Sequence, residues 1–142
     1  MSDYPLAPKN YTIENTWWKK QLVSVGGENA IVGRQRLIGG TQTWKLEYNK
    51  NGYATFQGVP PYPTDGKYIA VGQDGRDLVY SETPGLFQLE GTGVGENIFV
   101  VRPAGIGEDA QPLVGWRLQS GEDGSPVIIA NVMIEGAQWK FS

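Results

Sequence analysis

The amino-acid sequence predicts an all-β protein of the β-trefoil class, with twelve strands in three pseudo-repeats of four. Three observations lead to this fold. Glycine and proline, 20 and 9 of the 142 residues, are spread along the chain and divide it into short segments. These segments are rich in β-branched and aromatic residues and several alternate in polarity, which is typical of strands with one buried face. The segments also fall into three similar blocks, and three blocks are too few for a propeller but suit a three-lobed barrel.

We expect a single domain over residues 1–142, with repeats at about 11–50, 51–95 and 96–142. The strands of the first repeat are expected at 11–15, 20–25, 30–34 and 43–48. Those of the second are expected at 53–58, 67–72, 77–81 and 86–91. Those of the third are expected at 97–102, 113–119, 126–132 and 137–141.

The last strand of each block has the same pattern of an aromatic, a polar and an apolar residue, in Trp44-Lys45-Leu46, Phe87-Gln88-Leu89 and Trp139-Lys140-Phe141. The turns at 26–29, 73–76 and 121–124 each place glycine beside Asn or Asp, the residues that accept a positive φ in tight hairpins. One large residue from each repeat should fill the barrel. The expected core residues are Trp44, Phe87 and Trp139, with Leu46, Leu89, Phe141, Ile13 and Val25 beside them.

Composition excludes several classes of function. The chain has no His and no Cys, which removes Ser-His-Asp triads, thiolate chemistry, zinc sites built on these residues and disulfides. The net charge of −3 and the lack of a basic cluster argue against a nucleic-acid partner. No apolar stretch is long enough for a membrane span, and the start of the chain has no signal-peptide pattern, so we expect a cytoplasmic protein. The paired carboxylates lie on hydrophilic turns, so we expect no enzyme, no metal and no cofactor.

Two loops carry candidate binding residues. Trp17 and Trp18 are adjacent in the first connection and cannot both face one core, so at least one should be partly exposed. An exposed Trp offers a contact surface for a sugar ring or a partner protein, while the alternative is an anchor that folds over the barrel. In the connection between the third and fourth strands, Arg36 and Leu37 match a trypsin-like cleavage site, while the alternative is a solvated basic loop.

The segments 21–27 and 41–46, including the Gln-x-Trp ending at Gln42-Thr43-Trp44, resemble one repeat of the ricin-B-type lectins. In sugar-binding members of that family an Asp before the second-strand Val binds the sugar hydroxyls. The matching places here hold Ser24, Ala70 and Arg117, so the carboxylate is missing from each. The resemblance therefore implies the fold of these lectins but not their usual sugar site.

A resemblance to the mushroom β-trefoil protease inhibitors covers nearly the whole chain, through the segments 42–46, 51–53, 96–101 and 136–141. It implies a cytoplasmic fungal defence protein whose rigid loop enters a protease cleft, a serine protease being favoured over a cysteine protease. In the cospin-like group the first repeat carries a reactive Asn in the loop between its second and third strands, which places the reactive loop at Gly27-Glu28-Asn29. In the mycocypins two neighbouring connections bind papain-like proteases, which here are 15–19 and 34–40.

The leading hypothesis from the sequence is therefore a protease inhibitor. The alternative is a carbohydrate-binding protein that uses Trp17 or Trp18 as a stacking platform and a glycan as its partner.

Overall fold

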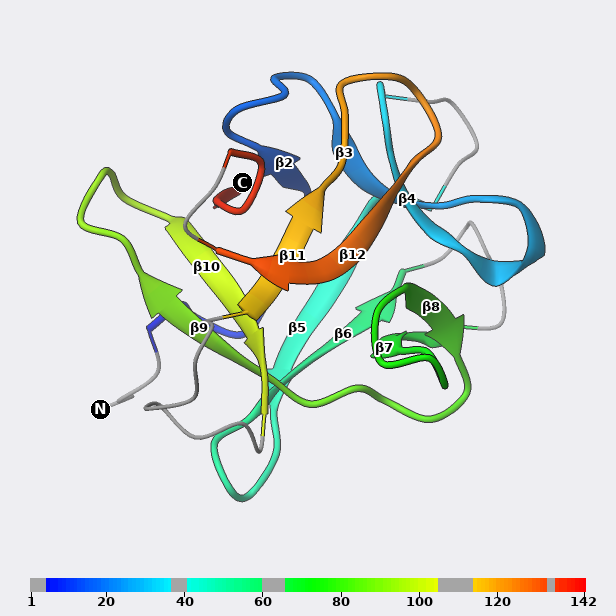
Figure 1. Cartoon of the computed structure of the whole chain (residues 1–142). Helices are drawn as coiled ribbons and strands as arrows, with labels where there is room; N and C mark the ends of the chain where they lie inside the picture. Colours follow the sequence, from blue (N-terminus) through cyan, green and yellow to red (C-terminus); the bar gives the residue numbers. More distant parts are fainter. Residues whose placement is uncertain (1–4, 37–40, 60–65, 105–113, 133–134) are drawn as a thin grey trace.

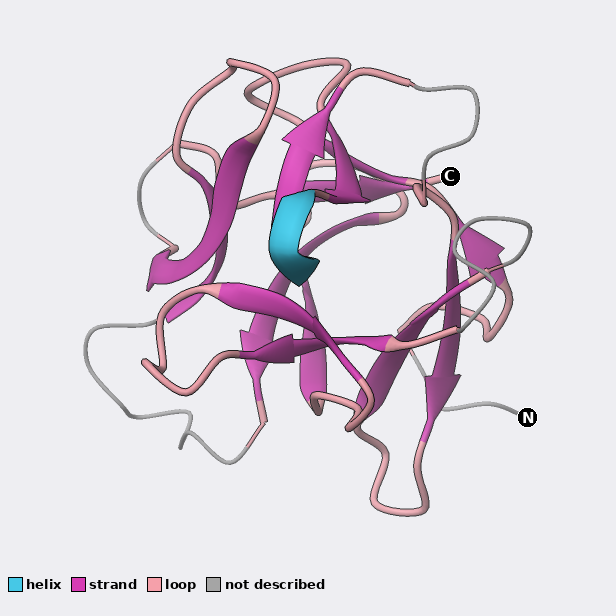
Figure 2. Cartoon of the chain, turned by 90° about the vertical axis from the view of Figure 1, so that its right-hand side faces the viewer, coloured by secondary structure: helices cyan, strands magenta, loops and turns pink. Residues whose placement is uncertain are grey.

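The computed structural model describes residues 5–36, 41–59, 66–104, 114–132 and 135–142. Within them the chain forms thirteen strands and one short 3-10 turn, η1 (Gly27–Asn29), drawn in cyan in Figure 2. The strands, numbered as in Figure 1, are β1 (Asn10–Tyr11), β2 (Ile13–Asn15), β3 (Leu22–Val25), β4 (Ile31–Arg34), β5 (Trp44–Tyr48), β6 (Ala54–Gly58), β7 (Tyr68–Val71), β8 (Leu78–Ser81), β9 (Phe87–Gly91), β10 (Ile98–Pro103), β11 (Val114–Leu118), β12 (Ser125–Asn131) and β13 (Trp139–Phe141). The described segments contain no helix with the length and hydrophobicity that crossing a bilayer requires.

Six strand positions form a closed barrel. Antiparallel pairing runs from β5 to β6, β9, β10 and β13. The ring is completed by β1, which pairs with β5, and by β2, which pairs with β13. The all-β trefoil expected from the sequence is therefore confirmed in its main feature.

The stretch predicted as one strand over 11–15 is two strands, so the described residues hold thirteen rather than twelve. The break is at Thr12, whose N–H donates to the Ser142 carbonyl (2.8 Å) and whose carbonyl accepts from the Ser142 N–H (3.0 Å). On either side of this point the chain pairs with a different neighbour, because it closes the ring. The other predicted strands lie within two residues of their observed bounds.

The remaining strands form three hairpins, β3–β4, β7–β8 and β11–β12, which are joined to one another (Figure 1). β12 pairs with β4, and isolated bridges join Ala30 to Val79 and Asp77 to Ile128. The hairpin turns contain the positive φ angles that their sequences predict, at Asn29 (61°), at Gly75 (73°) and at Gly124 (88°).

One main-chain hydrogen bond occurs in the same place in all three repeats. It joins the residue after one barrel strand to the residue before the strand that pairs with it. The three bonds are Val59 N–H to Thr43 O (3.1 Å), Ala104 N–H to Leu86 O (2.9 Å) and Thr16 N–H to Gln138 O (3.1 Å). The loops that carry Thr16, Leu86 and Gln138 are therefore fixed by a backbone frame that repeats around the barrel.

Most of the residues expected in the core fill the barrel. The fully buried ones include Trp44, Phe87, Trp139, Phe141, Ile13 and Leu46. Leu89 and Val25 are only partly buried and pack against this core. The indole N–H of Trp44 donates to the Val23 carbonyl (3.0 Å) and that of Trp139 to the Trp116 carbonyl (3.0 Å), so both Trp polar groups are satisfied.

Trp116 is a central core residue that the sequence analysis does not identify. Its ring centroid lies 5.1 Å from those of Phe56 and Phe87 and 6.3 Å from that of Trp139. A predicted strand over 113–119 gives its location, but not which of its two faces points inward. Contacts from three other strands settle that orientation.

Candidate functional site

The loop that follows β2 is organised by one buried side chain, Asn15. Its Oδ1 accepts hydrogen bonds from the backbone N–H groups of Trp17 (3.0 Å) and Trp18 (2.8 Å). Its Nδ2 donates to the Gly136 carbonyl (2.8 Å). Asn15 is fully buried and its bond to Gly136 is shielded from water, so its side chain holds the two tryptophans in one arrangement against the turn before β13.

Trp18 is the anchor of this loop. Its indole N–H donates to the Leu118 carbonyl (3.2 Å), and its ring is partly buried against the core. A Cβ at Gly121 would lie 2.9 Å from the ring. One at Gly136, where φ is 90°, would lie 2.6 Å from the Leu118 carbonyl oxygen, so glycine is favoured at both places. The alternative of an anchor that folds over the barrel therefore applies to Trp18 and not to Trp17.

Trp17 is the exposed member of the pair, with 57% of its surface accessible, as the sequence analysis expects for one of the two. Its ring stands nearly perpendicular to that of Trp18, with centroids 6.4 Å apart and planes at 88°. An exposed indole whose backbone is fixed from both sides offers a flat apolar surface at a low entropic cost of ordering.

A hollow of about 280 Å³ lies beside this ring, and we call it the Trp17 hollow. The described residues that line it are Thr16, Trp17, Val132, Glu135, Gly136, Ala137 and Gln138. It combines one aromatic surface with a carboxylate and a side-chain amide. Such a set can contact a ligand that has an apolar face and several hydroxyl groups.

The second repeat has a hollow in the equivalent place but with a different lining. This hollow, of about 450 Å³, lies around Leu86 and includes Val71, Pro84 and Pro103. The backbone bond from Ala104 to Leu86 corresponds to the bond from Thr16 to Gln138. Its described lining has no carboxylate, amide or indole. The same frame therefore presents a mainly apolar surface here, with hydroxyl groups from Tyr53, Ser81 and Thr83.

The lectin-like position of the first repeat is occupied by hydrogen bonds within the protein. Gln42 Nε2 donates to Ser24 Oγ (2.9 Å) and to the Gln35 carbonyl (2.8 Å), and Ser24 Oγ donates to the Leu22 carbonyl (2.8 Å). Ser24 and Gln42 are both buried. At the matching places Ala70 is buried and Arg117 Nε donates to the Glu135 carbonyl (3.0 Å). The lack of the usual sugar site, expected from the sequence, agrees with these contacts.

The residues predicted as alternative protease-binding loops, besides Trp17 and Trp18, lie at opposite ends of β4. Gly27, Glu28 and Asn29 are exposed in η1, where Glu28 (φ 57°) and Asn29 (φ 61°) are left-handed rather than extended. Arg36 is exposed at the other end of β4, beside a hollow that it lines with Glu14 and Lys20. Residues 37–40 of the 34–40 connection, which include Leu37, lie outside the described residues.

Asn15, Glu135 and Gln138 are candidate site residues that the sequence analysis does not single out. The sequence signal that could indicate this place is the alignment of the repeats, because the residue after a barrel strand adjoins the residue before the strand that pairs with it. Groups of three or more acidic, His or Cys side chains that would hold a metal ion are not found in the described part of the chain.

Comparisons with known proteins find no family model and no curated protein that matches the sequence. Solved structures do match. The Macrolepiota procera ricin B-like lectin in complex with lactose has a TM-score of 0.75 at 19% identity, covering 96% of each chain. The Rhizoctonia solani agglutinin has a TM-score of 0.72 at 22% identity, covering 96% of this chain and 95% of that one. SeviL bound to asialo-GM1 saccharide has a TM-score of 0.67 at 13% identity, covering 96% and 98%.

These neighbours change the interpretation of the sequence. The expectation of a protease inhibitor is wrong, because the structures that match 96% of this chain include a lectin, an agglutinin and a complex with a saccharide. The wider ricin-B-like resemblance is supported, and the narrower one to protease inhibitors is not. This chain has the β-trefoil fold of the ricin B-like lectins.

Proposed function

We propose that the protein binds carbohydrate through the Trp17 hollow. The observation that carries the proposal is an indole that is 57% exposed and yet held in place by the fully buried Asn15. A sugar ring has an apolar face of C–H groups, which packs on an aromatic ring, and hydroxyl groups, which need polar partners. Glu135 and Gln138 supply such partners in the same hollow.

The structural neighbours support a glycan as the ligand. One is a complex with lactose and another is bound to the asialo-GM1 saccharide. The position of the site in this chain is a separate inference from its own residues, because the places where ricin-B-type lectins carry their Asp hold Ser24, Ala70 and Arg117. The neighbours thus indicate the class of ligand, and Trp17 indicates the surface.

A glycan array followed by titration with lactose tests the proposal. Trp17→Ala should weaken lactose binding by roughly 2 kcal/mol, or about thirtyfold, as expected for an aromatic anchor at a binding surface. Trp17→Phe, which keeps a ring, should retain part of the affinity. In the wild type, lactose should also protect the exposed indole from quenching by acrylamide.

Leu86→Ala is the matched control, because Leu86 is a large exposed residue in the equivalent hollow of the second repeat. It should leave the lactose affinity unchanged. Thermal melting shows whether each variant is folded. A blank array with a folded wild type, or equal affinities for Trp17→Ala and wild type, would contradict the proposal.

A further inference from the structure

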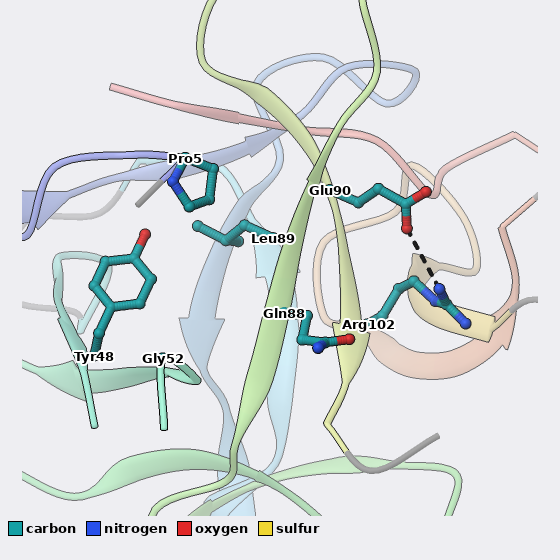
Figure 3. A pocket seen from close by; sticks show the side chains of 7 residues that line it. All are labelled: Pro5, Tyr48, Gly52, Gln88, Leu89, Glu90 and Arg102. Atoms are coloured by element: carbon teal, nitrogen blue, oxygen red, sulfur yellow. Dashed lines mark hydrogen bonds and ion pairs between the residues drawn. The ribbon is translucent and has the colours of Figure 1, made fainter. Parts of the chain in front are cut away.

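Another hollow, of about 480 Å³, lies on a different part of the barrel beside β9 and β10. Its lining includes Tyr48 from the end of β5, Gln88, Leu89 and Glu90 from β9, and Arg102 from β10. Figure 3 shows Glu90 and Arg102 joined by an ion pair, with Tyr48 on the other side of Leu89. No part of the Trp17 hollow belongs to this set of residues.

The side chain of Arg102 is only 6% exposed, and most of its hydrogen-bonding groups lack a partner. Its Nε and Nη2 are buried without any hydrogen bond. Its Nη1 lies 3.4 Å from Oε2 of Glu90, which is long for a charge-assisted hydrogen bond. A buried guanidinium with unpaired N–H groups is unfavourable, so an anion that supplied acceptors would be stabilised here.

Glu90 is a poor permanent partner for this charge. Its side chain is 57% exposed, so an ion pair with it is weakened by solvent, and the carboxylate can turn away into water. The fork of N–H groups on a guanidinium matches the two oxygens of a carboxylate better than one distant contact does. An incoming carboxylate would thus take the place that Glu90 now occupies.

The other walls of the hollow suit a sugar ring. Gln88 lies opposite Arg102 in the register of β9 and β10 and carries a side-chain amide. Leu89 and the ring of Tyr48 add apolar surface to the lining, on the opposite side of β9 from the Glu90–Arg102 pair (Figure 3). We propose that this hollow binds the carboxylate of an acidic sugar, with Arg102 as the group that holds the carboxylate and Glu90 as the group it displaces. That the ligand is a sugar rests on the proposed function, whereas the carboxylate rests on Arg102 alone.

Titration calorimetry with three probes tests this inference. Methyl β-D-glucuronide carries the carboxylate, methyl β-D-glucoside has the same ring without it, and acetate supplies a carboxylate without a ring. The glucuronide should bind about tenfold more tightly than either of the others, since a charged hydrogen-bonding group contributes about this factor. Glucuronide binding no tighter than glucoside binding overturns the carboxylate site, and acetate binding as tight as glucuronide binding overturns its assignment to a sugar.

Two variants, with a third as control, identify the residues. Arg102→Met should abolish the preference for glucuronide, and Arg76→Met, at an arginine on an exposed hairpin turn, should preserve it. Glu90→Gln should tighten glucuronide binding severalfold, because the competing carboxylate is removed. If Arg102→Met does not fold, Glu90→Gln decides, and unchanged or weaker binding by that exposed variant overturns the proposal.

Lactose titration of the same samples separates this inference from the proposed function. Glucuronide binding that depends on Arg102, with no lactose binding, contradicts the Trp17 site and leaves the Arg102 site. Lactose binding that depends on Trp17, with no difference between glucuronide and glucoside, overturns the Arg102 site alone.

Discussion

Asn15 combines two tasks in one side chain, because its oxygen fixes the loop of Trp17 and Trp18 while its nitrogen holds the turn at Gly136. A methyl group at this place would leave two backbone N–H groups and one carbonyl without this partner. Asparagine is suited to the task because its amide both accepts and donates hydrogen bonds. Its side chain is also short enough to reach the backbone of the residues that follow it.

Asn15→Ala should therefore lower the free energy of unfolding by roughly 2–4 kcal/mol, the effect of three lost bonds in a buried place. It should also weaken lactose binding, since the indole of Trp17 loses its support. Urea denaturation and lactose titration measure the two effects. Asn49→Ala is the matched control, because Asn49 Oδ1 also accepts from two backbone N–H groups, those of Asn51 and Tyr53, but in a less buried turn. Equal losses for the two variants would contradict the role given to burial.

The exposure of one tryptophan can be predicted from the sequence, because two adjacent side chains cannot point into one core. The roles of Asn15 and Glu135 cannot be predicted in the same way. They depend on contacts between segments about 120 residues apart, which form only when the barrel closes. Arg102 is similar, since nothing in the local sequence indicates that a charged residue of β10 is buried.

At the scale of elements, the hairpin turns show why the ends of most strands could be predicted from the sequence to within two residues. Each turn carries residues that accept a positive φ, and these mark where one strand ends and the next begins. The division of the first strand at Thr12 has no such local mark. It results from pairing with β5 on one side and β13 on the other, which is a property of the closed ring.

The turn between β7 and β8 also contains an acid-sensitive contact. Asp74 Oδ1 accepts from the N–H groups of Arg76 (2.9 Å) and Asp77 (3.0 Å). These backbone hydrogen bonds hold the pKa of Asp74 below its ordinary value, and the bond from Arg76 makes the larger contribution. A lowered pKa in the folded state means that this stabilisation is present above the pKa of the unfolded chain and is lost as the pH falls through the folded value.

Asp74→Asn should therefore reduce the loss of stability that the wild type shows as the pH falls from about 5 to about 3, the range around the ordinary Asp pKa. Urea unfolding at several pH values measures this difference. Glu82→Gln makes the same change of charge at an exposed position and serves as the control. Parallel pH profiles for wild type and Asp74→Asn would contradict the role of the turn.

At the scale of the whole molecule, the core is a cluster of aromatic rings contributed by all three repeats. Trp116 contacts rings from the second repeat at Phe56 and Phe87 and from its own repeat at Trp139. The sequence predicts which strands carry core residues, but the packing of these rings depends on how three lobes meet. A large contribution to stability is therefore expected from Trp116, a residue that the repeat pattern does not mark.

Trp116→Ala should lower the free energy of unfolding by about 3–5 kcal/mol, since it leaves a large cavity in a closed barrel. Trp116→Phe should cost much less, because it keeps ring contacts and removes an indole N–H that has no hydrogen-bond partner. Chemical denaturation measures both. Trp17→Ala removes an equally large but exposed ring and should change stability by less than about 1 kcal/mol. A Trp116→Ala loss no larger than that of Trp17→Ala would show that the ring is not central.

The bond that recurs as Thr16 to Gln138, Ala104 to Leu86 and Val59 to Thr43 joins main-chain atoms only. Although the Thr16 hydroxyl adds a bond to the Gln138 carbonyl (3.2 Å), the main-chain bond itself does not depend on which side chains occupy these positions. The surface at one repeat can carry an indole and a carboxylate while the surface at another is mainly apolar, and the barrel remains the same. A framework that is repeated three times therefore allows the binding surface of one repeat to change while the other two repeats keep theirs.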